Sequence, residues 1–293
     1  MMRTLLFIIL ILYSFSGYTQ DTIEVNKLTL TYRDTLQLDF YSPKNAQQAE
    51  MPLLLLMHGG GFAMGKRDGN LESRFCTEMA QKGYTVASIS YRLTRLNDPL
   101  SCDCATDKKV KTFVDGAEDL ADALVFLSNQ QHLAFDRNKI ILAGSSAGAE
   151  TVLHLAYMND DYRFKHINAV KIAGLISFSG AMMNASYINE SNAVPALFIH
   201  GKKDPLVPYG TGAHHFCSVE KAGYLMLDGP KTMAEKLKKL SVSYYLAYDP
   251  EGDHDWANKA YQETEIIHAF IDDIILEKKV SNASFKSKKI KLK

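Results

Sequence analysis

Six short apolar runs, separated in most cases by helical patterns, constrain the fold of this chain more than any other feature. They read MPLLLLMHG, YTVASISYR, KIILAGSS, VKIAGLISFSG, VPALFIHG and SVSYYLAY. A continuous apolar run of this length is typical of a strand buried on both faces of a parallel sheet. Alternating strands and helices predict right-handed crossovers, with helices on both faces of the sheet. The expected helices cover residues 70–82, 108–129, 147–157, 230–240 and 256–277.

The region before these runs predicts an antiparallel hairpin. Two stretches of alternating polarity, KLTLTYRD and TLQLDFYSP, lie close together with polar residues between them. At 293 residues and 46% hydrophobic content, the chain can bury a large core. No repeat, Pro-rich stretch or Gly/Ser linker divides it, so we expect one domain over residues 21–278.

The two ends of the chain have compositions of their own. Residues 1–20 offer an early Arg3, an apolar run at 5–12 and then small and polar residues. This pattern predicts a secretory signal, with cleavage near residues 19–20 and export to a periplasmic or extracellular location. The alternative is an anchor helix, although the run is short for a membrane span. The basic residues 279–293 are expected to form a disordered tail.

The charge balance indicates which ligands the chain can bind, and the cysteines indicate whether it can form disulfides or bind zinc. The 33 basic and 33 acidic residues cancel, so the electrostatic footprint of a nucleic-acid binder is missing and a small neutral ligand fits better. Cys76, Cys102, Cys104 and Cys217 allow three complete disulfide pairings in an exported chain, and the sequence does not choose between them. Zinc is an alternative for Cys102 and Cys104, but their spacing matches structural zinc sites poorly.

The residues that follow the apolar runs are the candidates for chemistry, because ligands of such sheets bind beyond the carboxyl ends of the strands. The first run ends in His58-Gly59-Gly60-Gly61-Phe62. Consecutive glycines leave backbone N–H groups open to a ligand oxygen. The loop lacks the lysine pattern of a P-loop and the spaced glycines of a dinucleotide fingerprint, so we expect no cofactor and no metal here.

A second candidate is the sequence GSSAG at residues 144–148, which follows KIILA. A serine on a tight strand-to-helix turn needs very small residues two positions before and two after it. Ser146 has glycine at both positions, whereas Ser145 has alanine at both. Glycine allows strand and helix to approach more closely than alanine does, which favours Ser146 as the nucleophile. Alanine is also small, so a turn centred on Ser145 remains an alternative.

An acid and a histidine follow the next two runs. Asp204 comes shortly after VPALFIHG, and His254 lies in a loop after SVSYYLAY. Taken alone, each is as compatible with a local turn or an ordinary loop as with catalysis. In chain order, however, an N–H donor loop, a serine elbow, an acid and a histidine all stand where acyl transfer needs them. The order Ser, Asp, His matches that of α/β-hydrolases.

At these residues the chain resembles α/β-hydrolase carboxylesterases of the hormone-sensitive-lipase-like and acetyl-esterase type. The resemblance rests on HGGGF at 58–62, GSSAG at 144–148, HGKKDPLVP at 200–208 and GDH at 252–254, and it covers about residues 25–277. It implies a mostly parallel, eight-stranded sheet with helices on both faces and little or no cap domain. It also implies a serine carboxylesterase, with a peptidase of the same fold or a non-catalytic small-ligand binder as alternatives.

The resemblance assigns a role to each of these residues. Ser146 would attack an ester carbonyl, His254 would accept its proton, and Asp204 would orient the imidazole. The backbone N–H groups of Gly60, Gly61 and Ala147 would hold the oxyanion, and His58 and Gly59 would support the oxyanion loop.

Other side chains near these positions have competing interpretations. We expect His200 to brace the acid loop, and Asp253 and Asp255 to face away from His254. For His214 and His215 the sequence allows either a place in the pocket or a solvated loop.

The substrate is less well determined. The segment after the run VKIAGLISFSG is short and polar, so we expect a modest, open pocket that favours short acyl esters, such as acetyl groups on carbohydrates, or aryl esters. Phe62 and Tyr209, with Tyr224, are the candidate substrate contacts.

Overall fold

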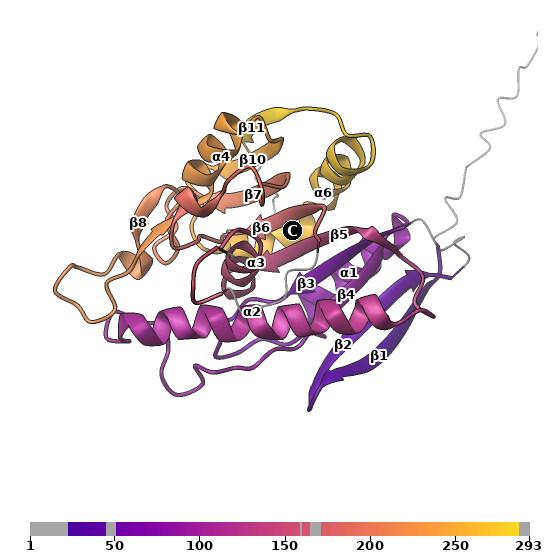
Figure 1. Ribbon diagram of the computed structural model, residues 1–293, viewed down its shortest axis with the longest axis horizontal. Helices are drawn as coiled ribbons and strands as arrows, with labels where there is room; N and C mark the ends of the chain where they lie inside the picture. The colour runs from indigo at the N-terminus through magenta and orange to yellow at the C-terminus, as the bar shows by residue number, and fades with distance from the viewer. Residues whose placement is uncertain (1–22, 45–50, 159, 165–170, 287–293) are drawn as a thin grey trace, which may run out of the picture.

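A nine-stranded sheet forms the centre of the described chain in the computed structural model (Figure 1). The structure describes residues 23–44, 51–158, 160–164 and 171–286. The strands lie in the order β1-β2-β4-β3-β5-β6-β7-β10-β11. Their bounds are β1 Val25–Arg33, β2 Leu36–Pro43, β3 Pro52–Met57, β4 Thr85–Ile89, β5 Asp136–Ser145, β6 Gly174–Phe178, β7 Ala196–Gly201, β10 Tyr244–Asp249 and β11 Asn282–Lys286. The predicted antiparallel hairpin of β1 and β2 is confirmed, and all neighbours from β4 to β11 pair in parallel.

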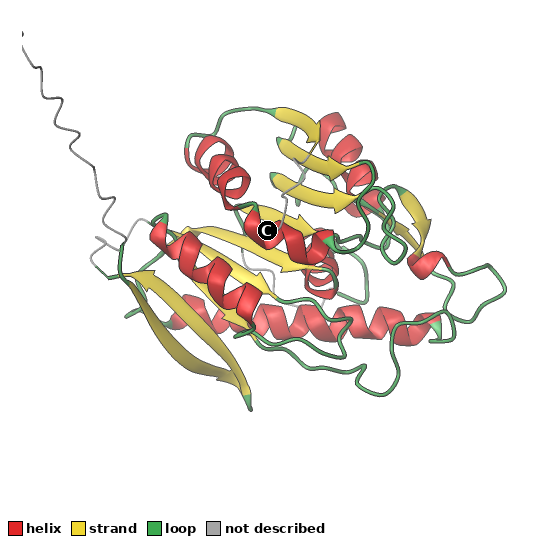
Figure 2. Cartoon of the chain, turned by 180° about the vertical axis from the view of Figure 1, so that it is seen from behind, coloured by secondary structure: helices red, strands yellow, loops and turns green. Residues whose placement is uncertain are grey.

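Helices cover both faces of this sheet, as predicted. Figure 1 looks at the face covered by α2 and α3, and Figure 2 shows the opposite face, covered by α1. The bounds are α1 Asn70–Gln81, α2 Thr106–Asn129, α3 Ala147–Tyr157, α4 Pro230–Lys239, α5 Trp256–Lys259 and α6 Thr264–Phe270, with short 3-10 helices η2 Ala185–Tyr187, η3 His214–Phe216 and η4 Ala260–Gln262 and a π-helix η5 Ile271–Leu276. The first four agree with the predicted ranges to within two residues.

The central strand β3 shows why its sequence, PLLLLM, is continuously apolar. Successive side chains of a strand point to opposite faces. Leu53 and Leu55 accordingly pack with the residues of α2 and α3, while Leu54 and Leu56 pack with those of α1 and α6. All four are fully buried, so the strand has no face that a polar residue could occupy. The interpretation of these runs as doubly covered strands is therefore correct.

Three stretches differ from the sequence expectations. The segment expected as one helix over 256–277 is interrupted at Glu263, whose ψ of 37° is not helical, and it ends in the π-helix. The region after β7, expected to be irregular, holds a small antiparallel sheet of β8 (Thr211–Ala213) and β9 (Met226–Asp228). The predicted disordered tail contains the ninth strand, β11, whose Phe285 ring packs 6.0 Å from Tyr245 of β10.

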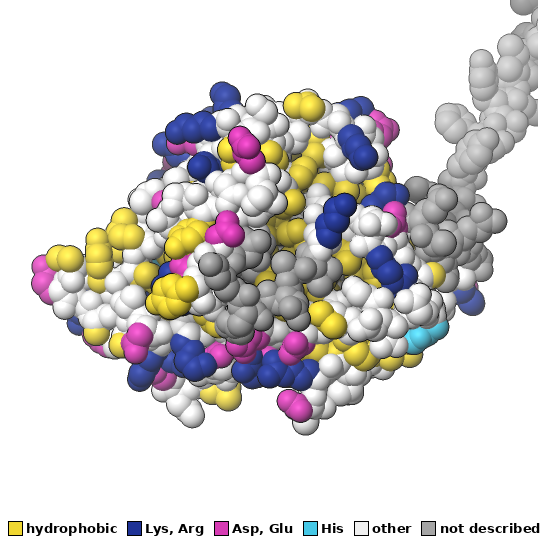
Figure 3. All heavy atoms as spheres, viewed as in Figure 1, with side chains coloured by type: hydrophobic (Ala, Val, Ile, Leu, Met, Phe, Trp, Pro, Cys, Tyr) yellow, Lys and Arg dark blue, Asp and Glu magenta, His cyan; other side chains and the backbone are white. Residues whose placement is uncertain are grey.

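The surface is consistent with a balanced charge. Lys and Arg side chains are interspersed with Asp and Glu over the face seen in Figure 3. None of the helices in the described ranges is long and apolar enough to cross a membrane. The predicted signal, residues 1–20, lies outside the described residues.

Candidate active site

Ser146 stands on a tight turn between β5 and α3, with backbone angles of φ 49° and ψ −116°. A positive φ is costly for a residue with a Cβ, so tight surroundings must hold it. A Cβ on Gly144 would lie 2.4 Å from the backbone of Gly148, and one on Gly148 would lie 2.1 Å from the carbonyl oxygen of Met57. Both glycines are therefore required for this close approach of strand and helix, and the elbow is centred on Ser146.

Ser145 has a structural contact instead. It is the last residue of β5, it is 2% exposed, and its Oγ donates a hydrogen bond of 2.7 Å to the carbonyl oxygen of Ala257. This bond ties the elbow to α5, which follows the loop of His254. The two adjacent serines thus point to different surroundings, as the glycine spacing predicts.

Three strand ends bring Ser146, His254 and Asp204 together. Ser146 Oγ lies 2.9 Å from His254 Nε2, and His254 Nδ1 lies 2.7 Å from Asp204 Oδ2. An Nδ1–H group bound to the carboxylate leaves Nε2 as the acceptor for the serine hydroxyl. This is the arrangement in which a histidine can take a proton from a serine.

The acid of this set is held in its ionised form. Asp204 is buried, and its Oδ1 accepts the backbone N–H groups of Leu206 and Val207 at 2.9 Å each. Burial opposes ionisation, but the hydrogen bonds from His200 and His254 outweigh it and lower the pKa of Asp204 below its ordinary value. The carboxylate therefore keeps its charge beside the imidazole at neutral pH.

His200 and Asp253, which lie close in sequence to Asp204 and His254, make contacts of their own. His200 Nε2 lies 3.1 Å from the carbonyl oxygen of Val207 and 3.3 Å from Asp204 Oδ2, so it braces the acid loop. Asp253 accepts the backbone N–H of Asp255. The carboxylate that contacts His254 belongs to Asp204.

The glycine loop after β3 presents unbonded N–H groups. Gly60 and Gly61 have φ values of 111° and 61°, and a Cβ on Gly60 would lie 2.2 Å from the carbonyl oxygen of Met64. Within the described ranges, the backbone N–H groups of Gly60, Gly61 and Ala147 donate to no other protein group. All three residues line the same cavity as Ser146. They are placed to bind an oxyanion.

His58 and Gly59 support this loop from below. The His58 ring stacks on Tyr91 with centroids 4.3 Å apart, and its Nδ1 lies 2.7 Å from the Gly59 carbonyl oxygen. The Tyr91 hydroxyl donates to the His58 carbonyl oxygen at 3.0 Å. Burial lowers the pKa of His58 to about 4, so the ring is neutral and structural. This placement agrees with the supporting role predicted for His58.

The cavity has a volume of about 530 Å³ and opens at the carboxyl ends of the strands. Ser146 and His254 lie on its wall beside the glycine loop, and Leu100, Leu206 and Val207 contribute apolar surface. This volume lies within the range of about 300–1,000 Å³ that is usual for small-molecule sites.

The sequence is similar to those of several known esterases. The BD-FAE family model matches residues 38–183. Gut esterase 1 of Caenorhabditis elegans is 32% identical over 133 residues, which are 44% of this chain and 22% of that protein. Probable carboxylesterase 1 of Arabidopsis thaliana is 28% identical over 171 residues, 53% of this chain and 48% of that protein. This chain thus spans about a quarter of the length of the animal esterases that it matches.

Solved esterase structures have the same fold. Esterase 2 of Thermogutta terrifontis superposes with a TM-score of 0.62 at 18% identity, over 85% of this chain and 94% of that one. Brefeldin A esterase, a bacterial homologue of human hormone-sensitive lipase, gives 0.55 at 14% identity, over 87% and 76% of the two chains. The chain thus has the α/β-hydrolase fold, and its residues 38–183 are similar to the BD-FAE family. Both findings agree with the resemblance inferred from its motifs.

The predicted substrate contacts need correction. Phe62 is fully buried and packs against Tyr91 and Phe113, with centroids 5.9 and 6.0 Å away. Tyr209 packs on His200 and Tyr248. Neither Phe62, Tyr209 nor Tyr224 is among the residues that line the cavity, whereas His214 and His215 are. An aromatic residue in these loops can lie in the core or line the cavity, and the sequence alone did not distinguish the two.

The sequence analysis did not identify three polar residues of the cavity wall, Glu72, Glu150 and Asn258, of which Glu150 is the most deeply buried. Glu150 lies four positions after Ser146 on α3, is 2% exposed and faces the cavity. The signal was present, because a glutamate is unusual in the otherwise apolar segment AGAETVLHLAY. Burial, followed by the neighbouring Asp204 charge, raises the pKa of Glu150 to about 8.

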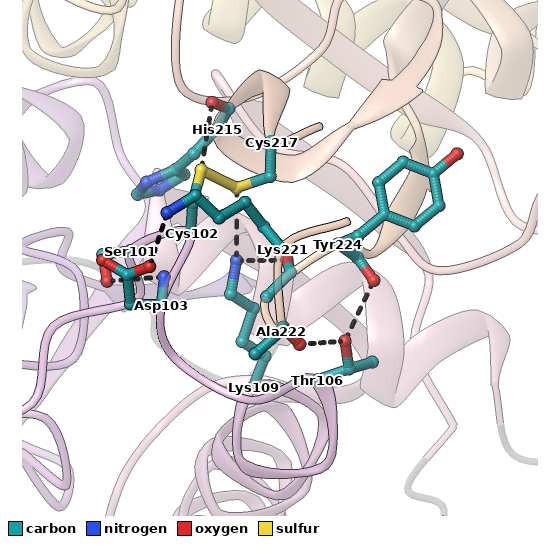
Figure 4. The surroundings of a disulfide bond; sticks show 11 residues. Ser101, Cys102, Asp103, Thr106, Lys109, His215, Cys217, Lys221, Ala222 and Tyr224 are labelled. Carbon is teal, nitrogen blue, oxygen red and sulfur yellow. Dashed lines mark hydrogen bonds and ion pairs between the residues drawn. A yellow bond between two sulfur atoms is a disulfide. The ribbon is translucent and has the colours of Figure 1, made fainter. Parts of the chain in front are cut away.

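A disulfide between Cys102 and Cys217 joins two loops beside the cavity (Figure 4). The sequence allowed three complete pairings of the four cysteines, but the structure has one bond, between Cys102 and Cys217, and leaves Cys76 and Cys104 as buried thiols. Thr106 Oγ1 donates to the carbonyl oxygens of Ala222 and Tyr224, which adds polar contacts between the same two loops. The zinc interpretation of Cys102 and Cys104 is wrong, because Cys102 is bonded to another cysteine.

Removing this disulfide should destabilise the hydrolase. It closes a loop of 115 residues, and disulfides typically stabilise a protein by about 2–4 kcal/mol. We expect the double variant Cys102→Ser/Cys217→Ser to lose stability of this size in urea unfolding, and dithiothreitol to have the same effect on the wild type. Cys104→Ser, which leaves the disulfide intact, is the matched control. An unfolding midpoint of the double variant equal to that of the wild type would contradict the assignment.

Proposed function

We propose that this hydrolase is a serine carboxylesterase that acts on short acyl or aryl esters, acetylated carbohydrates among them. The observation that carries the proposal is the set of Ser146, His254 and Asp204, in hydrogen-bond contact at 2.9 and 2.7 Å and facing three unbonded backbone N–H groups across one cavity. Acyl transfer through an acyl-enzyme needs these components and no cofactor. The named esterases among its relatives support the same class of reaction.

In the first half of the proposed reaction, His254 Nε2 accepts the Ser146 hydroxyl proton as Oγ attacks the ester carbonyl carbon. The N–H groups of Gly60, Gly61 and Ala147 stabilise the resulting oxyanion. Collapse of this intermediate breaks the bond to the alcohol oxygen, which takes its proton from the imidazolium. Asp204 stabilises the imidazolium throughout.

In the second half, a water molecule attacks the acyl-enzyme carbonyl while His254 again accepts the proton. Collapse releases the carboxylic acid and returns the proton to Ser146 Oγ. The Ser146 Oγ–acyl bond that forms in the first half is thus broken in the second, and the enzyme is regenerated.

The preference for short acyl chains is supported by the limited volume of the cavity and by the segment after β6, none of whose described residues lines the cavity. The segment after β6, a natural place for a lid, is tied down: the Met183 N–H donates to His154 Nε2 at 3.1 Å, and the Ala185 N–H donates to Asp228 Oδ2 at 2.7 Å. A fixed, short segment and a volume of about 530 Å³ suit an acetyl or butyryl group better than a long chain.

A series of p-nitrophenyl esters from acetate to laurate tests this preference. We expect kcat/KM to be highest for acetate or butyrate and to fall at least about tenfold by laurate, because each added methylene must find apolar surface in a cavity of limited size. The rates should be compared below the critical micelle concentration of each ester. A maximum at twelve carbons or longer would contradict the short-acyl proposal while leaving the esterase proposal intact.

We also propose that the protein is exported. The signal-like composition of residues 1–20 supports this, and so does the Cys102–Cys217 disulfide, because such bonds persist in oxidising compartments. Cell fractionation with N-terminal sequencing of the mature protein tests it. The full-length chain in the cytoplasmic fraction would contradict it.

A further inference from the structure

Glu150 and His214 form a buried polar pair on the cavity wall whose hydrogen-bonding capacity the described protein does not satisfy. They are 2% and 1% exposed and both line the cavity. Glu150 Oε1 and His214 Nδ1 have no hydrogen-bond partner within the described ranges. The two side chains face each other, with 3.3 Å between Glu150 Oε1 and His214 Nε2. Buried polar atoms are nearly always bonded, so this pair indicates a ligand.

The charge state of the pair narrows the ligand class. Burial, followed by the charge of Asp204, raises the pKa of Glu150 to about 8, so the carboxyl is mainly protonated at neutral pH. Burial, followed by the neighbouring His215, lowers the pKa of His214 well below its ordinary value, so the ring is neutral. The pair is therefore mainly uncharged at the pH where an esterase operates.

The donors and acceptors of a neutral pair match a hydroxyl group. A protonated carboxyl and a neutral imidazole each offer one donor and at least one acceptor. Because Glu150 Oε1 and His214 Nε2 lie 3.3 Å apart without a hydrogen bond, donors and acceptor lone pairs of both groups remain for a ligand. An anionic ligand would meet the Asp204 carboxylate, and a cationic one the Lys109 ammonium, both of which act electrostatically on Glu150. A hydroxyl, which donates and accepts without a charge, suits this environment.

The pair is also held in place before any ligand arrives. The His214 backbone N–H donates to Leu225 at 2.8 Å, and its ring lies against Phe113 and His215. Cys217, three positions further on, is fixed by the disulfide. Glu150 sits on α3, one helical turn beyond the nucleophile, about 6 Å along the helix axis. A rigid partner at this distance can select a group close to the reacting bond.

We propose that Glu150 and His214 bind a hydroxyl group of the ester substrate, close to the scissile bond, and thereby make the enzyme selective for hydroxyl-bearing esters. This inference rests on the proposed esterase function. It names the substrate class of the same site and gives Glu150 the role of a specificity-determining residue.

Matched ester pairs test the proposal. Ethyl 3-hydroxybutyrate against ethyl butyrate places the hydroxyl on the acyl side, and glycerol 1-monoacetate against propyl acetate places it on the alcohol side. We expect the wild type to favour the hydroxyl-bearing ester at least about tenfold in kcat/KM in one pair, because an unmet buried hydrogen bond penalises the analogue. Glu150→Leu should lower that ratio about 10- to 100-fold, and Glu150→Gln, which keeps a donor and an acceptor, should retain it.

Two further variants complete the test. His214→Phe keeps a ring and removes both nitrogens, so it should also lower the ratio, and it decides the outcome if Glu150→Leu does not fold. Glu235→Leu removes an exposed carboxylate far along the chain on α4 and should leave the ratio unchanged. A wild-type ratio near one in both pairs, or a ratio retained in His214→Phe and Glu150→Leu, overturns the proposal. A wild type that cleaves neither these esters nor p-nitrophenyl acetate instead overturns the esterase function itself.

Discussion

Replacing Ser146 by alanine should lower kcat/KM for p-nitrophenyl acetate by about 10⁴- to 10⁶-fold. The variant loses the only atom that forms the covalent bond in the proposed reaction, Oγ, while the N–H groups of Gly60, Gly61 and Ala147 remain in place. Stopped-flow or steady-state release of p-nitrophenolate measures the loss. Circular dichroism should show an unchanged fold, because the backbone angles of Ser146 are compatible with alanine at the same cost.

Ser145→Ala is the matched control for this variant. Its Oγ bonds to the Ala257 carbonyl oxygen, so the expected loss is stability, about 1–3 kcal/mol for an acceptor left buried and unbonded. Activity should remain within about tenfold of the wild type. A large loss of activity in Ser145→Ala, together with a nearly active Ser146→Ala, would reverse the assignment of the two serines and with it the glycine argument.

Asp204→Asn should lower kcat by about 10⁴-fold. The carboxylate oxygen Oδ1 accepts the N–H groups of Leu206 and Val207, so the single oxygen of asparagine is expected to stay there. The amide NH₂ would then face His254 Nδ1 and donate to it. This fixes the tautomer with the proton on Nε2, which cannot accept the serine proton. A pH–rate profile measured with p-nitrophenyl acetate should show partial recovery at high pH.

Asp253→Asn is the control for this acid. Asp253 is adjacent to His254 in sequence, but its carboxylate accepts the Asp255 N–H. We expect kcat/KM of Asp253→Asn to stay within about threefold of the wild type. A loss in Asp253→Asn comparable to that in Asp204→Asn would mean that the orienting acid has been misassigned.

The fold was largely predictable because its central strands, such as β3, β4 and β6, are buried on both faces. A strand such as PLLLLM at β3 has no solvent-facing position, so its whole sequence reports burial. The elbow was predictable for a related reason: residues two before and two after Ser146 sit within about 2.5 Å of backbone if given a Cβ, and only glycine fits. Both patterns lie within a short stretch of sequence, so they can be recognised without knowing which distant residues they contact.

The features that sequence reasoning missed depend on contacts between distant segments. The edge strand β11 is dominated by polar residues and owes its place to pairing with β10 and to the packing of Phe285 on Tyr245. The partner of Cys102 lies 115 positions away, so spacing could not identify it. Phe62 was predicted to contact the substrate, but its ring lies in the core. Its positive φ of 57° accompanies this inward orientation of the ring.

Covalent labelling at Ser146 tests the central claim most directly. Paraoxon phosphorylates a serine hydroxyl that a neighbouring base activates, so it is a suitable probe. The purified protein should be treated with paraoxon and digested, and the peptide that spans residues 139–157 should be sequenced by mass spectrometry. We expect one diethylphosphoryl group on Ser146, formed in step with the loss of esterase activity. A label on Ser145, or full inactivation with no label on this peptide, would contradict the account.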